Sequence, residues 1–136
     1  MNSLAPALTA VRLSLHVLAA AVFVGGQITM VGLLPDVRKL GGDAAVRLAR
    51  AFAKVTWPAY AVLLLTGIWN VSAVHASHST SAWKTVLMIK IAVAVLAGVA
   101  AWLHSRSTAR TPLAVWGSIA GTASIAALVL GVFLSG

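Results

Sequence analysis

The residues of this sequence that could do chemistry are two histidines, a lysine and a methionine set in apolar segments. His16 and Met30 lie in the first such segment, and Lys90 and His104 lie in the third. An ionisable side chain in a membrane helix is costly, so by default it faces the interior of a helix bundle and marks a function. Imidazole, thioether and amine groups suit copper or haem iron. These four residues are therefore candidate ligands for a metal or a cofactor.

A second candidate metal site lies in the polar segment between the second and third apolar stretches. His75 and His78 are three residues apart, so both imidazoles can bind one metal ion if the backbone turns helically there. The alternative is that both are solvated loop residues. The chain has no cysteine, and its only acids, Asp36 and Asp43, lie in one loop. This composition excludes thiolate sites and argues against a carboxylate proton relay or a Mg²⁺ or Ca²⁺ site in the membrane.

Membrane-spanning helices must position these residues. Of 136 residues, 60% are hydrophobic and 9% are charged, whereas soluble domains carry about 25% charged residues. Four apolar stretches reach the ~20 residues that cross a bilayer as a helix, and none alternates with a period of two. They are approximately residues 8–34, 55–74, 85–104 and 113–135. The sequence therefore predicts an all-α integral membrane protein, an antiparallel bundle of four transmembrane helices in a single domain over residues 1–136.

The basic residues predict how the bundle is oriented. The first connection holds Arg38, Lys39, Arg47, Arg50 and Lys54, the third holds Arg106 and Arg110, and the second, SAVHASHSTSAW, has no Lys or Arg. By the positive-inside rule, the first and third connections are cytoplasmic, and both termini lie outside the cytoplasmic membrane. The net charge of +8 then reports orientation, and we expect no nucleic-acid partner.

Local signals predict helix ends and one close helix contact. Pro35 follows the first predicted helix, and the segment GGD supplies a break and a candidate N-cap at Asp43. The fourth helix carries Gly117, Gly121 and Ser124 on one face, and small residues at this spacing let helices approach closely.

Helical spacing places the candidate ligands on one face of each helix. The two stripes are His16, Ala20, Phe23, Gln27 and Met30, and Lys90, Ala94, Ala97, Ala101 and His104. At ~1.5 Å rise per residue, His16 and Lys90 lie about 7–8 Å outside the midplane, and Met30 and His104 about 13–14 Å inside it. We therefore predict an outer polar level, to which Asn70 of the second helix could add, and an inner polar level.

Structural alternatives remain open for each of these residues. His16 could be bonded across helices, and Lys90 could extend towards the outer headgroups. His104 lies close to the interface, where a solvated or lipid-facing role competes with a ligand role. The alanines between Lys90 and His104 could leave room for a macrocycle, or they could be a close helix contact.

Several segments resemble the transmembrane domain of the copper-resistance protein D (CopD) family. They are LHVLAAAVFVGGQ, RAFAKVTWPAYAVLLLTGIWNV and WKTVLMIKIAVAVL, and the similarity covers approximately residues 12–105. The resemblance implies a role in moving copper across or into the cytoplasmic membrane. Many family members are longer, which leaves a homo-oligomer as one way to complete a small chain.

A weaker similarity is to the HemJ-type protoporphyrinogen oxidases, four-helix proteins that bind haem b. This resemblance makes His16 and His104 candidate haem ligands and Lys90 a functional cation. The two histidines lie about 20 Å apart in depth, so each would need another partner on its iron, such as Met30 for His104.

The favoured prediction from the sequence is copper handling, by a transport or binding protein rather than an enzyme. His75 and His78 would capture the ion outside, from solution or from an extracytoplasmic metal chaperone, and His16, Met30 and His104 would bind it within the bundle. The alternatives are a haem-b protein acting in electron transfer or porphyrin oxidation, and an accessory subunit whose polar residues only join helices.

Overall fold

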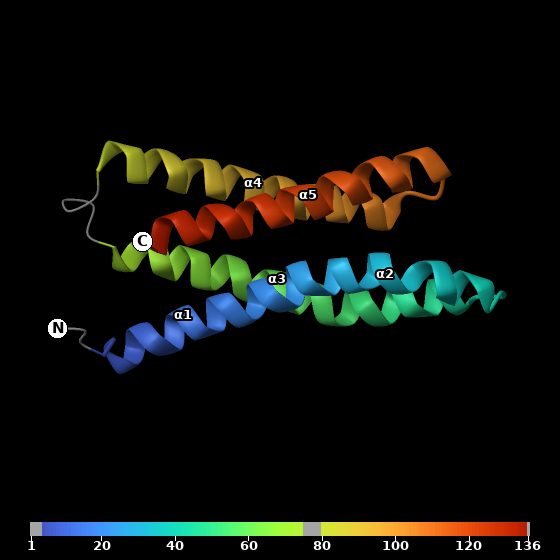
Figure 1. Ribbon diagram of the computed structural model, residues 1–136, viewed down its shortest axis with the longest axis horizontal. Coiled ribbons are helices and arrows are strands. Elements are labelled where there is room, and N and C mark those ends of the chain that lie inside the picture. Colours follow the sequence, from blue (N-terminus) through green and yellow to red (C-terminus); the bar gives the residue numbers. More distant parts are fainter. Residues whose placement is uncertain (1–3, 75–79, 136) are drawn as a thin grey trace. The chain divides into compact units, whose positions relative to one another are not determined.

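The computed structural model describes residues 4–74 and 80–135, and these are almost entirely helical (Figure 1). The elements are α1 (Ala7–Ala20), a π-helical turn η1 (Ala21–Gly25), α2 (Gly26–Lys39), α3 (Ala44–Ala73), α4 (Ser81–Arg106) and α5 (Arg110–Ser135). Helices α1, η1 and α2 run on as one, so four continuous helices are long and apolar enough to cross a membrane. The predicted all-α class with four membrane-spanning helices is confirmed.

The helices are longer than the apolar stretches that predict them. The first continues through Pro35 to Lys39, and the third element begins at Ala44, well before the apolar stretch from residue 55. Hydropathy marks only the part that needs lipid, whereas Ala, Leu, Arg and Lys extend a helix into the interface. Pro35 has no backbone N–H, which removes one hydrogen bond from the helix, but its fixed φ is helical, so α2 continues past it.

The turn between α2 and α3 uses two glycines. Gly41 and Gly42 have φ values of 73° and 56°, a left-handed conformation that L side chains rarely adopt. Asp43 immediately precedes α3 as predicted, but its side chain makes no capping hydrogen bond. The α4 helix is capped instead in the expected way, because the Thr80 hydroxyl accepts from the Trp83 amide at 3.1 Å.

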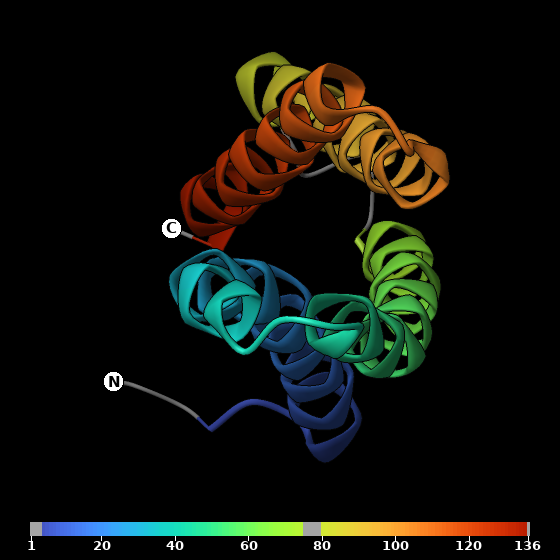
Figure 2. The same cartoon turned by 90° about the vertical axis from the view of Figure 1, so that its right-hand side faces the viewer.

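The contacts divide the chain into two compact units, Met1–His75 and Ala76–Gly136. In the first, α1, η1 and α2 lie antiparallel against α3, and in the second α4 lies against α5 (Figures 1 and 2). We call these the first and second hairpins. The loop end of each hairpin is the end with its connecting loop, residues 40–43 or 107–109, and the open end is the opposite end. The single-domain organisation stays a prediction.

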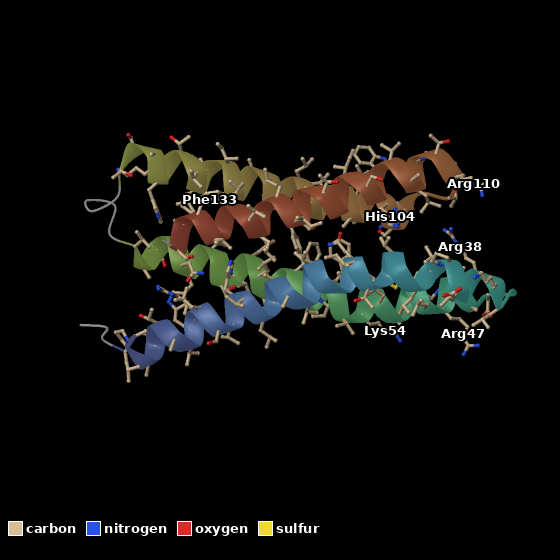
Figure 3. The ribbon with its side chains drawn as sticks, viewed as in Figure 1. Arg38, Arg47, Lys54, His104, Arg110 and Phe133 are labelled. Atoms are coloured by element: carbon tan, nitrogen blue, oxygen red, sulfur yellow. The ribbon has the colours of Figure 1, made fainter. Side chains whose placement is uncertain are left out.

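Each hairpin has its own kind of core. In the first, Phe23 is 1% exposed and its ring lies 4.9 Å from that of Tyr60. In the second, the buried residues are all small: Ala97, Gly98, Ala100, Ala120, Ala123 and Ser124. Large apolar side chains such as Val31, Leu65 and Phe133 are exposed instead, and Figure 3 labels Phe133 near the end of α5. Such surfaces suit lipid, so the chain is a multi-pass membrane protein.

Candidate functional site

His16 is held in place by a hydrogen bond across the first hairpin. Its Nδ1 lies 2.8 Å from Oγ1 of Thr66 on α3, and that hydroxyl donates to the Val62 carbonyl at 2.7 Å. Because the hydroxyl hydrogen is directed to Val62, the imidazole donates its Nδ1–H to the hydroxyl oxygen. The lone pair of the neutral ring is then at Nε2. A metal-binding histidine is oriented in this way, by a hydrogen bond from its other ring nitrogen.

The surroundings of His16 explain how it fits between the helices. Thr66 is 5% exposed, and His16 itself is half-buried. A Cβ at Gly67 would lie 3.6 Å from Cε1 of His16, an ordinary contact distance, so the ring packs on this glycine. The bond across helices that we considered as the structural alternative is therefore present. It is also the bond that would orient a ligand.

A pair of polar side chains lies one helical turn from His16 and Thr66. In an antiparallel pair, the contact of His16 with Thr66 places Arg12 of α1 opposite Asn70 of α3, each one turn towards the open end. Nε of Arg12 and Oδ1 of Asn70 are both buried and have no hydrogen-bond partner within the described residues. The sequence analysis overlooked Arg12, although its i, i+4 spacing from His16 places both on one face.

His104 has a comparable anchor in the second hairpin. Its Nδ1 lies 2.8 Å from the carbonyl oxygen of Leu113 on α5. A carbonyl only accepts, so Nδ1 carries the hydrogen and the lone pair of the neutral ring is again at Nε2. A Cβ at Gly117 would lie 3.0 Å from Nδ1, so this glycine makes room for the ring. His104 lies near the loop end, where it is exposed (Figure 3).

Lys90 also lies over a glycine of α5. A Cβ at Gly131 would approach Nζ of Lys90 to 2.9 Å, so the amine lies across α5 near the open end. Between Lys90 and His104, Ala97 is 1% exposed and Ser124 of α5 is 2% exposed. Ala97 is therefore in a close helix contact, whereas Ala94 and Ala101 are half-buried, and room for a macrocycle along the stripe stays a prediction. The predicted small face of α5 is only partly in this contact: Gly117 lies against His104 and Ser124 is buried, whereas a Cβ at Gly121 would meet nothing within 4 Å.

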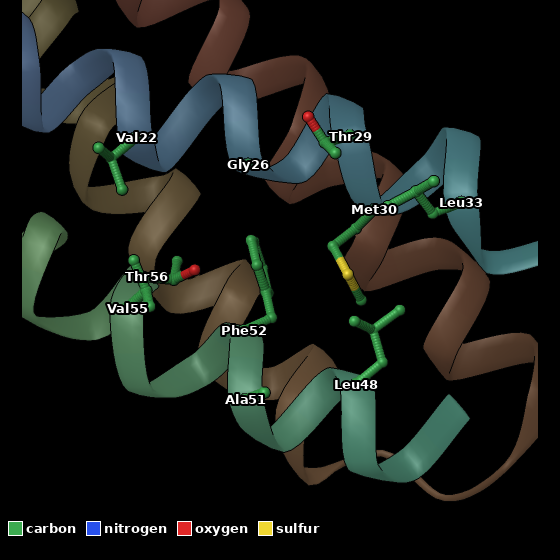
Figure 4. Close-up of a pocket in the computed structure, with 10 residues that line it drawn as sticks. All are labelled: Val22, Gly26, Thr29, Met30, Leu33, Leu48, Ala51, Phe52, Val55 and Thr56. Atoms are coloured by element: carbon green, nitrogen blue, oxygen red, sulfur yellow. The ribbon is translucent and has the colours of Figure 1, made fainter. Parts of the chain in front are cut away.

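Met30 lies in an apolar groove near the loop end of the first hairpin (Figure 4). The groove has a volume of about 360 Å³, and Met30 faces Leu48 and Phe52 of α3 across it. A Cβ at Gly26 would lie 2.7 Å from the Phe52 ring, so this glycine sets the spacing of the helices. Met30 is about 21 Å from His16 along the helix. The first hairpin therefore does not bring these two candidate ligands together.

The remaining predictions pair residues of different hairpins or concern residues outside the described part of the chain. His16 and Lys90 belong to different units, and so do Met30 and His104, so both predicted levels stay predictions. His75 and His78 lie outside the described residues. Among the described residues, no three His, Cys, Asp or Glu side chains gather as a metal site would require.

The chain's two acids lie at the loop end of the first hairpin. Asp36 forms an exposed ion pair with Lys39 at 2.6 Å, and Asp43 stands before α3. Basic residues surround this end, and Figure 3 labels Arg38, Arg47 and Lys54 there. The charged groups within the apolar parts of the helices are therefore cations.

Comparisons of this chain with protein-family models, with curated proteins and with solved structures find no match.

Proposed function

We propose that this chain is a haem-b-binding membrane protein, acting in electron transfer or porphyrin oxidation, in which His16 would hold the iron. The observation that carries the proposal is the bonded chain from His16 through Thr66 to the Val62 carbonyl. It holds the imidazole in the tautomer that presents Nε2 to a metal. In haem proteins with a proximal histidine, such as globins and peroxidases, the protein holds the iron through one imidazole, so His16 would not need the second ligand considered from the sequence.

The charges around His16 favour haem over a free copper ion. Arg12 lies one turn away with its Nε buried, and the two acids of the chain lie at the opposite end of the hairpin. In a low-dielectric environment a guanidinium repels a nearby metal cation that no carboxylate neutralises. Haem b carries two carboxylates, which the same guanidinium attracts. The orphaned Nε of Arg12 is thus a group that fits this cofactor.

Three residues of the first hairpin then have defined roles in holding the cofactor. Bound haem supplies one-electron chemistry at its iron. Thr66 fixes the tautomer and orientation of His16, and the half-buried position of the ring restricts its rotation. Gly67 leaves the space that the ring occupies on α3.

Copper handling is the second candidate, and one observation favours it. His104 is a second imidazole held by Nδ1, in the other hairpin, so the chain offers two separate single-imidazole positions. Two weak sites of this kind suit an ion that must both enter and leave. The repulsion from Arg12 counts against a copper ion at His16.

An absorption spectrum of the detergent-purified protein, with iron and copper analysis of the same sample, tests the proposal. We expect a Soret band with stoichiometric iron, lost in His16→Ala and retained in His104→Ala, which serves as the matched control. A colourless protein whose copper content falls in each variant would instead support copper handling. Neither metal after reconstitution would overturn both proposals and leave the accessory-subunit interpretation.

A further inference from the structure

The polar pair beside His16 includes two buried atoms whose hydrogen bonding is incomplete. Nε of Arg12 and Oδ1 of Asn70 lie at adjacent positions, and in the part of the chain that the structure describes neither atom has a hydrogen-bond partner. A buried donor or acceptor without a partner destabilises the fold, and more so if it is charged. An arginine on a membrane helix adds a further cost. Such a pair calls for a ligand or a group that completes it.

We propose that Arg12 and Asn70 form a carboxylate-binding pocket at the open end of the first hairpin, and that the carboxylate is one carried by the porphyrin. This inference rests on the proposed function. The guanidinium is a planar fork of donors that matches a carboxylate in a bidentate pair. Arg12 lies about 6 Å from His16 along the helix axis and on the same face, so both can reach one ligand.

Asn70 is a positioning residue in this pocket. Its Oδ1 is an acceptor at the level of Arg12, and the buried Nε of Arg12 is a donor. A hydrogen bond between these two atoms in the ligand-bound protein would leave the two terminal nitrogens of the guanidinium as a fork for the carboxylate.

The same oxyanion chemistry has a second source, the phosphate of a lipid headgroup. A long arginine near a helix end can extend to the interface and bind such a phosphate. The two sources differ in one respect that an experiment can use. If Arg12 binds a porphyrin carboxylate, then removing the charge of that carboxylate removes the contribution of Arg12 to porphyrin affinity. If Arg12 binds a lipid phosphate, it does not.

The test compares haem b with its dimethyl ester, which keeps the iron and the macrocycle but has no free carboxylate. Both are titrated into the protein in a phosphate-free detergent, using wild type, Arg12→Gln, Asn70→Ala and the matched control Arg38→Gln, an exposed arginine of the same hairpin. We expect wild type and Arg38→Gln to bind haem b at least tenfold more tightly than the ester. Arg12→Gln should lose this preference, and Asn70→Ala should reduce it, with the affinity for the ester unchanged.

The outcomes separate the two proposals. Equal weakening of both ligands in Arg12→Gln would overturn the pocket, because it would show a structural or lipid-binding role, and would leave the haem proposal standing. An undiminished preference in Arg12→Gln would likewise overturn the pocket alone. If wild type binds neither ligand, the proposed function fails, and the pocket for a porphyrin carboxylate fails with it.

Discussion

The two hairpins are antiparallel helix pairs that solve the same packing problem differently. In the first, bulky side chains fill the interface, with Phe23 against Tyr60 and Tyr60 edge-on to Trp57 at 6.1 Å. In the second, glycine, alanine and serine let α4 and α5 approach closely. Lipid tails are as apolar as leucine, so helices in a membrane associate through packing and hydrogen bonds. Both hairpins have a hydrogen bond between their helices, and they differ in the size of the side chains that pack.

This difference determines where a ligand can be bound. In the second hairpin, Lys90 and His104 each lie over a glycine of α5, and the buried residues between them are small. In the first hairpin, Phe23 is buried beside Tyr60, and within the described residues Nε of Arg12 and Oδ1 of Asn70 have no hydrogen-bond partner. The buried contact of the second hairpin is thus made of small residues, whereas the first hairpin keeps buried polar atoms that a ligand could bind.

The π-helical turn lies in the first hairpin. Over Ala21–Gly25 the helix is wider than an α-helix, and Phe23 and Val24 are both buried there. A π turn changes which side chains share a face, and such turns are frequent at functional sites. Both His16 and Met30 still face α3, on either side of this turn.

The largest expected effect comes from removing the anchor of His16. Thr66→Val keeps the shape of the side chain but removes the oxygen that accepts from Nδ1. Loss of such an orienting partner lowers metal-site affinity by about 10–100-fold, so porphyrin titration should show a decrease of that size. Thr66→Ser, which keeps the hydroxyl, should restore binding. An affinity unchanged in Thr66→Val would show that the bond to His16 serves only to join helices.

A smaller effect is expected from emptying the core of the first hairpin. Phe23→Ala removes the ring that packs on Tyr60. In a membrane the exposed ring would contact lipid rather than water, so the substitution mainly removes packing contacts. We therefore expect the free energy of unfolding to fall by about 2 kcal/mol. Thermal unfolding in detergent measures this change. A neutral result would mean that the aromatic pair does not hold α1 against α3.

The smallest effects should come from single methyl groups added to α5, and they should differ by position. Gly117→Ala meets Nδ1 of His104 at 3.0 Å and should destabilise by about 1 kcal/mol. Gly131→Ala meets only the flexible end of Lys90, which can move, so its effect should be a few tenths of that size. Gly121 has nothing within 4 Å of its added Cβ and provides the control. Equal stability of all three variants would contradict the close contact at His104.

Much of the fold was predictable because the hydropathy of a segment depends only on its local sequence. Four apolar stretches predicted four helices, and the small face around Gly117 predicted a close contact of α5. The ends were less accurate, because Pro35 and the basic segment after Asp43 are helical outside the apolar part. Hydropathy does not register a helix that continues into the polar interface.

The candidate site was predictable only in part. His16, Lys90 and His104 were identified because polar residues are conspicuous in apolar helices. Their contacts across helices depend on register, which the spacing on one helix does not contain. The pairing of His16 with Thr66, and hence the placement of Arg12 opposite Asn70, depends on the axial register of α1 against α3.

By itself, the sequence determined the solvent of this protein, the number of its helices and the face of each helix that carries polar groups. These properties depend on local composition and on the 3.6-residue period, which are present in the unfolded chain. Only the tertiary structure decided which polar groups are satisfied. His104 bonds to the Leu113 carbonyl of α5, whereas Nε of Arg12 and Oδ1 of Asn70 have no partner among the described residues, because satisfaction depends on which helix lies opposite and at what distance.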